Sequence, residues 1–198
     1  NQTKEVGIKP TPSIGGVGLI KDYTKMISMD LKEIDNLVLI IGKTEGHIDQ
    51  SLFARTILDE KNGPPPEVNL FNEKNNGESI LNLIDKGYVK SAHDISLGGL
   101  LVAISKMCIK GNKGIKINKS KNLINEIEYF FAEDQGRYLI EVNKEDLKEV
   151  TKILNKNSVH HEELGIITQN DMIINEKTKV TIDELKSYYT NWLSKYMS

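Results

Sequence analysis

The stretch that decides the fold is SAHDISLGGLLVAISKMCI, which runs from Ser91 to Ile109. Its second half predicts an amphipathic helix from Leu97 or Gly98 to about Ile109, because apolar residues return every three or four positions. These apolar positions are Leu97, Leu100, Leu101, Ile104, Met107 and Cys108. A helix with one apolar face must bury that face against another layer, so we expect a layered domain.

The first half of the same stretch places polar side chains directly before the predicted helix. Asp94 or Ser96 could cap the helix by accepting a hydrogen bond from a free N–H of its first turn. The same N–H groups attract anions, and Gly98 and Gly99 carry no side chain that would block a phosphate. A carboxylate beside phosphates is also a ligand for Mg²⁺. From the residues alone, an ordinary helix cap with a packed glycine pair is the open alternative and the more frequent one.

Strands and helices interleave along the rest of the chain. The run NLVLII, from Asn36 to Ile41, is continuously apolar and predicts a buried strand. Further strands are expected at 115–117, 138–142, 163–167 and 171–174, and further helices at 51–58, 69–85, 144–155 and 183–197. In the helix over 69–85, the residues expected to face inward are Leu70, Ile80, Leu81 and Ile84. We therefore predict an α+β fold, a layered α/β/α domain with a mixed sheet.

A second polar segment, FAEDQGRY, occupies Phe131 to Tyr138, directly before a predicted strand. Glu133, Gln135 and Arg137 could contact a polar ligand, and the acids could hold a metal. The alternative is a solvated loop with a local ion pair, which is the more frequent arrangement for such residues.

Composition restricts the class of protein. Hydrophobic residues make up 38% and charged residues 27% of the 198 residues, as in soluble globular domains. The net charge of −2 gives no electrostatic reason to expect nucleic acid or an anionic membrane as partner. No apolar run approaches the ~20 residues of a membrane span. The single cysteine, Cys108, excludes an internal disulfide, and we expect it to be buried in a cytoplasmic protein.

The first residues differ in character from the rest. They are polar, include Pro10 and Pro12, and are followed by Gly15, Gly16 and Gly18. Because each proline disfavours helix in the residue before it, we expect an extended tail over 1–18 and a domain over 19–198. Asn1 is not an initiator Met, so we expect the chain to be part of a longer polypeptide.

Four stretches together resemble the C-terminal domain of the AIR-synthase-related ATP enzymes. They are PTPSIGGVGL (10–19), GPPPEVNL (63–70), SAHDISLGGL (91–100) and FAEDQGRY (131–138), and they occur in the family's order. The His-Asp-x-Ser-x-Gly-Gly form at 93–99 is similar to that of the phosphoribosylformylglycinamidine synthases. Two positions depart from that pattern: Leu97 stands in place of an acid, and HIDQS (47–51) in place of Leu-Gly-Gly-Ser.

The resemblance implies a fragment of an ATP-dependent C–N ligase of purine biosynthesis. That ligase converts formylglycinamide ribonucleotide and glutamine-derived ammonia to the amidine. The cofactors implied are ATP and Mg²⁺, with Asp94 on the metal. The nucleotide would contact Ser96, together with His93, Gly98 and Gly99. No catalytic residue is expected in the chain, which should be inactive when isolated.

The resemblance also implies partners. They are the remaining domains of the same polypeptide, which would include the tail's N domain, a separate glutaminase subunit and a small third subunit. Neither nucleic acid nor a membrane is expected as a partner. The alternatives are a scaffold or auxiliary nucleotide-binding domain without a catalytic role, and the C domain of another enzyme of this superfamily.

Overall fold

The structure is a computed structural model that describes residues 2–3, 6–7, 13–118 and 125–197. Its helices are η1 (Tyr23–Lys25), α1 (Leu52–Thr56), α2 (Leu70–Asp85), α3 (Gly99–Gly111), α4 (Glu126–Phe131), η2 (Lys144–Asp146), α5 (Leu147–Lys156) and α6 (Ile182–Met197). Its strands are β1 (Gln2–Thr3), β2 (Val6–Gly7), β3 (Leu37–Ile41), β4 (Val89–Asp94), β5 (Gly114–Ile117), β6 (Tyr138–Val142), β7 (His161–Thr168), β8 (Asp171–Ile174) and β9 (Thr178–Thr181).

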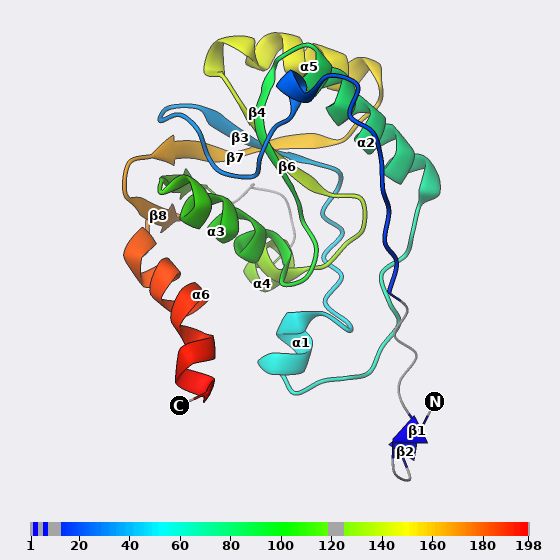
Figure 1. Cartoon of the computed structure of the whole chain (residues 1–198), viewed down its shortest axis with the longest axis vertical. Coiled ribbons are helices and arrows are strands. Elements are labelled where there is room, and N and C mark those ends of the chain that lie inside the picture. The colour runs from blue at the N-terminus through cyan, green and yellow to red at the C-terminus, as the bar shows by residue number, and fades with distance from the viewer. Residues whose placement is uncertain (1, 4–5, 8–12, 119–124, 198) are drawn as a thin grey trace.

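Seven strands form one sheet in the order β4-β6-β3-β7-β5-β8-β9. The β5–β8 pair is parallel and the other neighbours are antiparallel, so the sheet is mixed. Helices α2 and α5 cover one face of the sheet, and α3 and α4 cover the other (Figure 1). The predicted layered α/β/α domain with a mixed sheet is therefore confirmed.

Strand β3 lies at the centre of the sheet and all five of its residues are buried. Because side chains alternate along a strand, Val38 and Ile40 join the core under α3, while Leu37, Leu39 and Ile41 join the core under α2 and α5. A strand that is buried on both faces has no polar side, which explains the continuous apolar run in the sequence.

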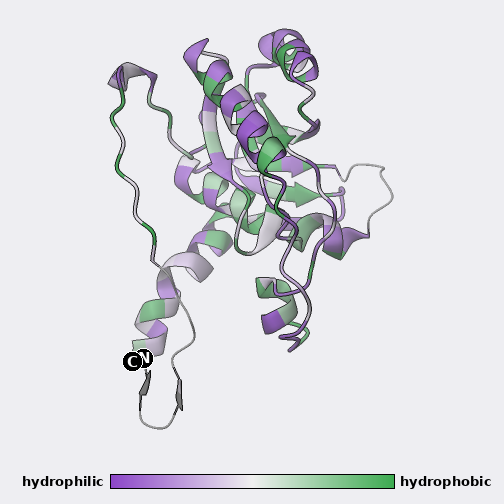
Figure 2. Ribbon diagram, turned by 90° about the vertical axis from the view of Figure 1, so that its right-hand side faces the viewer, coloured by the Kyte–Doolittle hydropathy of each residue, from purple (hydrophilic) through white to green (hydrophobic). Residues whose placement is uncertain are grey.

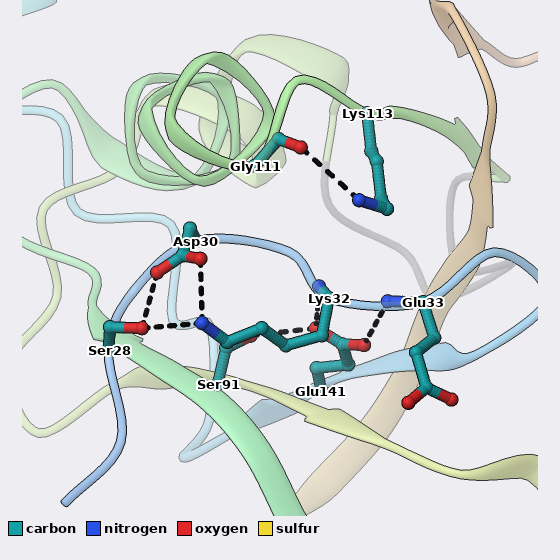
Figure 3. A network of polar contacts seen from close by, with 8 residues as sticks. All are labelled: Ser28, Asp30, Lys32, Glu33, Ser91, Gly111, Lys113 and Glu141. Carbon is teal, nitrogen blue, oxygen red and sulfur yellow. Dashed lines mark hydrogen bonds and ion pairs between the residues drawn. The ribbon is translucent and has the colours of Figure 1, made fainter.

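A buried carboxylate fastens the segment before β3 to the sheet (Figure 3). Glu141 on β6 is fully buried and accepts four hydrogen bonds. The donors are the backbone N–H groups of Lys32 (2.8 Å) and Glu33 (3.0 Å), the Asn36 amide (2.8 Å) and the Ser91 hydroxyl (2.9 Å). This network holds the connection into β3 beside the edge strand β4.

Some predictions about individual elements were wrong. Ser91–Asp94 was expected to be a polar lead into the helix, and it forms the end of strand β4. Leu70 and Leu81, expected to face inward from α2, are 77% and 66% exposed. The buried stripe of α2 is instead Asn76, Ser79, Ile80 and Leu83, at helical spacing. Helix α4 and strand β9 were not anticipated.

The N-terminal arm runs outside the layered body (Figure 2). From residue 13 to residue 20 it has no regular secondary structure and is exposed throughout. Its apolar side chains Ile14, Val17 and Leu19 are almost fully exposed. Pro10 and Pro12 lie outside the described residues, and the division of the chain into a tail over 1–18 and a domain over 19–198 remains a prediction.

Candidate functional site

A pocket of about 330 Å³ lies where β4 ends and β6 begins. Two of the segments singled out in the sequence line it, 94–97 after β4 and 133–138 before β6. Glu73 of α2 and Pro66 complete the wall. A second hollow of about 540 Å³ shares Pro66, Glu73 and residues 134–136 with it, so the two are adjacent. The fold therefore brings together two segments about 40 residues apart in the chain.

Asp94 is the one carboxylate of the 93–99 motif. Its side chain is 56% exposed and lines the pocket, and its Oδ1 lies 3.1 Å from His93 Nδ1. Partial desolvation would raise the pKa of Asp94, but the hydrogen bond from Ser96 and the nearby His93 outweigh it, so the pKa is lowered. Asp94 is consequently ionised at neutral pH and presents hard oxygen atoms to the pocket. Ser96 is exposed and lines the same wall.

His93 lies behind Asp94 and does not line the pocket. Its side chain is only 16% exposed, and its Nε2 is buried without a hydrogen-bond partner among the described residues. Desolvation lowers the pKa of His93, although the charge of Asp94 opposes the shift. The imidazole is therefore neutral at physiological pH, and in this structure it contacts Asp94 instead of the pocket.

The glycine pair packs against protein. Gly98 and Gly99 have positive φ values of 90° and 72°. A Cβ on Gly99 would lie 2.7 Å from the backbone carbon of Phe131, and one on Gly98 would meet the Val102 side chain at 2.6 Å. The pair thus allows α3 to approach the 131–132 backbone closely, and neither glycine lines the pocket.

The predicted cap of α3 by Asp94 or Ser96 was wrong. The N-cap residue is Gly98, whose N–H donates to Glu133 Oε1 at 2.8 Å, and the Gly99 N–H donates to the Ser96 carbonyl at 2.9 Å. No side chain of the described residues caps α3, and the distant Glu133 carboxylate binds the N–H of the N-cap residue itself. The N–H groups of Gly98 and Gly99 therefore have protein partners in this structure.

The FAEDQGRY segment is an anchored turn and not a solvated loop, although the local ion pair that this alternative included is present between Arg137 and Asp134. The Asp134 carboxylate is nearly buried and accepts from the N–H groups of Glu45, Gly46 and His47 at 2.9–3.1 Å. The Arg137 side chain is fully buried, 3.8 Å from Asp134, and donates to Thr44 Oγ1 and the Ala132 carbonyl. Desolvation lowers the pKa of Arg137, and the charge of Asp134 opposes the shift.

Only part of the predicted ligand set in this segment faces open space. Glu133, Gln135 and Arg137 all line the first pocket, but the Arg137 guanidinium donates to protein acceptors, and of the three only the exposed Gln135 also lines the second hollow. Leu97, the apolar residue in place of an acid, is 54% exposed and stands on the pocket wall. Tyr138 also lines the pocket, and its pKa is raised by desolvation and by the charges of Glu73 and Asp94.

Glu73 was missed by the sequence reasoning. It lies in the first turn of α2, three residues after the GPPPEVNL stretch, and that stretch was the available signal. Among the described residues, no group of three or more His, Cys, Asp or Glu side chains could hold a metal alone. In the same part of the chain, no helix combines the length and the apolar character needed to cross a membrane.

Comparison with known proteins gives the class to which this fold and site belong. The family model of the AIR synthase related protein, C-terminal domain, matches residues 33–175, which contain β3 to β8 and both segments of the pocket. The chain belongs to this family.

Within the family, the chain is similar to one particular protein. It is 67% identical over 197 residues to phosphoribosylformylglycinamidine synthase subunit PurL of Pelagibacter ubique, and the match covers the whole chain. The chain spans 27% of the length of that relative.

Solved structures show the same fold at low sequence identity. The chain matches "T. maritima PurL complexed with ATP" with a TM-score of 0.63 and 17% identity, over 82% of this chain and 27% of that one. It matches "Structure of PurLQS from Thermotoga maritima" with a TM-score of 0.63 and 19% identity, over 82% of this chain and 28% of that one.

Proposed function

We propose that the chain is the C-terminal domain of a phosphoribosylformylglycinamidine synthase. The whole protein would use ATP to convert formylglycinamide ribonucleotide and glutamine-derived ammonia to formylglycinamidine ribonucleotide in purine biosynthesis. The 67% identity to a PurL subunit, sustained over the entire chain, is the observation that carries this proposal. The pocket supports it, because the motif typical of this enzyme forms one of its walls.

The domain's part in that enzyme would be to hold a nucleotide with Mg²⁺. Asp94 would hold the metal, because it is ionised and exposed and carries the hard oxygen ligands that Mg²⁺ prefers. The described residues offer no complete metal cage, which suits a cation that keeps waters and takes phosphate oxygens as ligands. Ser96 would contact the nucleotide from the same wall, and the bound cation would neutralise phosphate charge.

The other predicted contacts take different roles in this proposal. His93 would act through Asp94, because its Nδ1 faces that carboxylate. Gly98 and Gly99 would shape the start of α3, and Gln135 would contact the ligand from the opposite wall. A Thermotoga maritima PurL has been solved with ATP, which supports a nucleotide as the ligand class.

Catalysis would require more than this domain. We propose that the remaining domains of the polypeptide supply the reacting groups, and that the isolated chain forms no amidine from formylglycinamide ribonucleotide, ATP and ammonium. A glutaminase subunit and a small third subunit would be its partners in the cytoplasm, in keeping with the PurLQS assembly of Thermotoga maritima. Clear turnover by the isolated chain would contradict this part of the proposal.

A second candidate is a scaffold domain without its own nucleotide. The observation in its favour is that Glu133 and Ser96 already satisfy the first amides of α3. Asp94→Ala in the whole protein separates the two functions. If the domain holds a nucleotide, Asp94→Ala should bind Mg·ADP roughly ten- to a hundredfold more weakly, because the charged metal ligand that it removes is worth ~1.5–3 kcal/mol.

The measurement is the thermal midpoint of nucleotide-stripped protein, with and without added Mg·ADP. Asp85→Ala is the matched control, because the Asp85 side chain is 69% exposed and does not line the pocket. A nucleotide site predicts that Asp94→Ala loses most of the Mg·ADP-induced rise and that the control keeps it. An unchanged rise in Asp94→Ala would remove Asp94 from the site and favour the scaffold.

A further inference from the structure

One oxygen of Glu133 joins two parts of the chain that are about 45 residues apart. Glu133 Oε1 accepts from the Leu52 N–H, the first residue of α1, at 2.7 Å, and from the Gly98 N–H at 2.8 Å. Both donors stand at the start of a helix, where N–H groups lack intrahelical partners. A single oxygen that accepts from both helix starts joins the two segments at one point.

The residues next to Glu133 also hold the segment 45–66, which leaves the layered body and returns to it and is called the excursion below. Helix α1 lies outside the layered body on long connections (Figure 1). Phe53 of α1 stacks on Phe131 with ring centroids 4.8 Å apart, and the Glu133 N–H donates to the His47 carbonyl at 3.0 Å. Asp134 holds the N–H groups of residues 45–47. Residues 45–54 are therefore attached to the body through the four residues from 131 to 134.

This joint lies directly beside the candidate site. Gly98 follows Ser96 and Leu97, which form one wall of the pocket. Pro66, at the far end of the excursion, lies on the wall as well. The distance between the Ser96–Leu97 side of the pocket and its Pro66 side thus depends on the bonds made by Glu133.

We propose that Glu133 is a positioning residue that sets the shape of the nucleotide pocket and does not bind the ligand. The inference rests on the proposed nucleotide site. Glu133 itself lines the pocket, and its Oε1 is already shared between two backbone amides. Acceptor geometry, and not the charge of the side chain, is therefore the property of Glu133 that matters for binding.

Two substitutions of Glu133 in the whole protein separate these properties. Glu133→Gln keeps a carbonyl oxygen that can accept both N–H groups, and Glu133→Ala removes it. We expect Glu133→Gln to bind Mg·ADP within about threefold of the wild type. Glu133→Ala should bind roughly tenfold more weakly or worse, because it leaves two backbone N–H groups without their acceptor. Glu128→Ala, five residues earlier and outside the pocket lining, is the control.

Limited trypsin digestion reads the joint without any ligand. Arg55 and Lys61 are exposed sites in the excursion. Cleavage at both should accelerate in Glu133→Ala and stay at the wild-type rate in Glu133→Gln, while peptides from α5 are released at an unchanged rate. Identifying the peptides by mass spectrometry separates local release from general unfolding.

A substitution from the other side of the bond guards against a folding failure of Glu133→Ala. Leu52→Pro removes the N–H that Glu133 accepts, and the first helical position tolerates proline. Ser51 before it has φ −65° and ψ 163°, a conformation that proline allows in its predecessor. Leu52→Ala retains the N–H and is its control. We expect Leu52→Pro, but not Leu52→Ala, to reproduce the faster cleavage.

The outcomes distinguish this inference from the proposed function. Equal loss of Mg·ADP affinity in Glu133→Gln and Glu133→Ala would overturn it, because charge would then be the property that binds. Tighter binding by Glu133→Ala would also overturn it, since Glu133 would then compete with phosphate. Unchanged cleavage in both Glu133→Ala and Leu52→Pro would overturn the joint whatever the binding. If the wild type binds no Mg·ADP, and Glu133→Ala and Leu52→Pro are still cleaved faster than the wild type, the nucleotide site is overturned and the joint remains supported.

Discussion

Replacing Glu141 by Gln tests whether the buried carboxylate under β4 stabilises the fold as its bonds indicate. Oε1 of Glu141 accepts from Glu33 N and Asn36 Nδ2, and Oε2 accepts from Lys32 N and Ser91 Oγ. A glutamine oxygen can keep the first pair, and its NH₂ group can donate to the Ser91 hydroxyl. The same NH₂ faces the Lys32 N–H, so that donor loses its acceptor.

The expected cost follows from that single mismatch. A hydrogen bond to a charged group is worth ~1.5–3 kcal/mol, and the orphaned N–H places Glu141→Gln near the upper end, at about 3 kcal/mol. Ser91→Ala removes one donor and leaves the other three, so we expect about 1.5 kcal/mol. In a domain of this size each kcal/mol lowers the thermal midpoint by about 2–4 °C.

Urea unfolding followed by far-ultraviolet circular dichroism measures these differences. Asp30→Asn is the control, because the Asp30–Lys32 ion pair lies beside the network with side chains 35–36% exposed. Such a pair contributes ~0–1 kcal/mol. A Glu141→Gln variant within ~0.5 kcal/mol of the wild type would show that the four bonds contribute little net free energy. If Asp30→Asn lowered the free energy of unfolding more than Glu141→Gln, the expectation that the more buried carboxylate contributes more stability would be refuted.

Three further predictions concern single positions. Gly99→Ala should lower the free energy of unfolding by at least ~1–3 kcal/mol, because Gly99 has a positive φ and a Cβ there would meet the backbone of Phe131. Gly77→Ala, in the open interior of α2, should raise the free energy of unfolding by ~0.5–1 kcal/mol, and chemical denaturation measures both changes. Burial raises the pKa of Cys108 to about 12, so the native thiol should not react with a disulfide reagent at pH 8 and should react fully in denaturant. Burial lowers the pKa of His93, so near pH 6 the unfolded chain binds more protons than the folded one. The wild type should therefore lose stability from pH 7 to pH 5 relative to His93→Gln, and parallel curves of unfolding free energy against pH for the two proteins would contradict this.

The layered fold could be predicted because its main elements carry strong local patterns. Strand β3 is apolar at each position from 37 to 41, and α3 repeats apolar residues at helical spacing over more than three turns. Strand β4 could not be recognised in the same way, because four of the six residues of VKSAHD are polar. It is an edge strand whose pairing with β6, far along the chain, makes it a strand. The buried stripe of α2 was misjudged because it includes Asn76 and Ser79.

The sequence predicted which residues line the candidate site, but not which hydrogen bonds they make. Asp94 and Ser96 stand on the pocket wall, as the 93–99 motif indicated. The hydrogen bond at the start of α3 could not be inferred locally, because Glu133 reaches Gly98 across 35 residues of sequence. Long-range hydrogen bonds of this kind leave no spacing to recognise. The 131–138 segment therefore looked like a free loop, although Asp134 and Arg137 anchor it from within.

The position of β3 in the sheet has a consequence for how the chain is made. Both neighbours of β3 come late: β6 starts about 100 residues after β3 ends, and β7 follows β6. At a synthesis rate of ~5–20 residues per second, LVLII leaves the ribosome several seconds before either partner exists. Short apolar β-branched segments without charge are prone to self-association while they are unpaired. A ribosome-associated chaperone that binds apolar pentapeptides would accordingly engage this part of the nascent chain at residues 37–41 and release it once residue 168 has emerged.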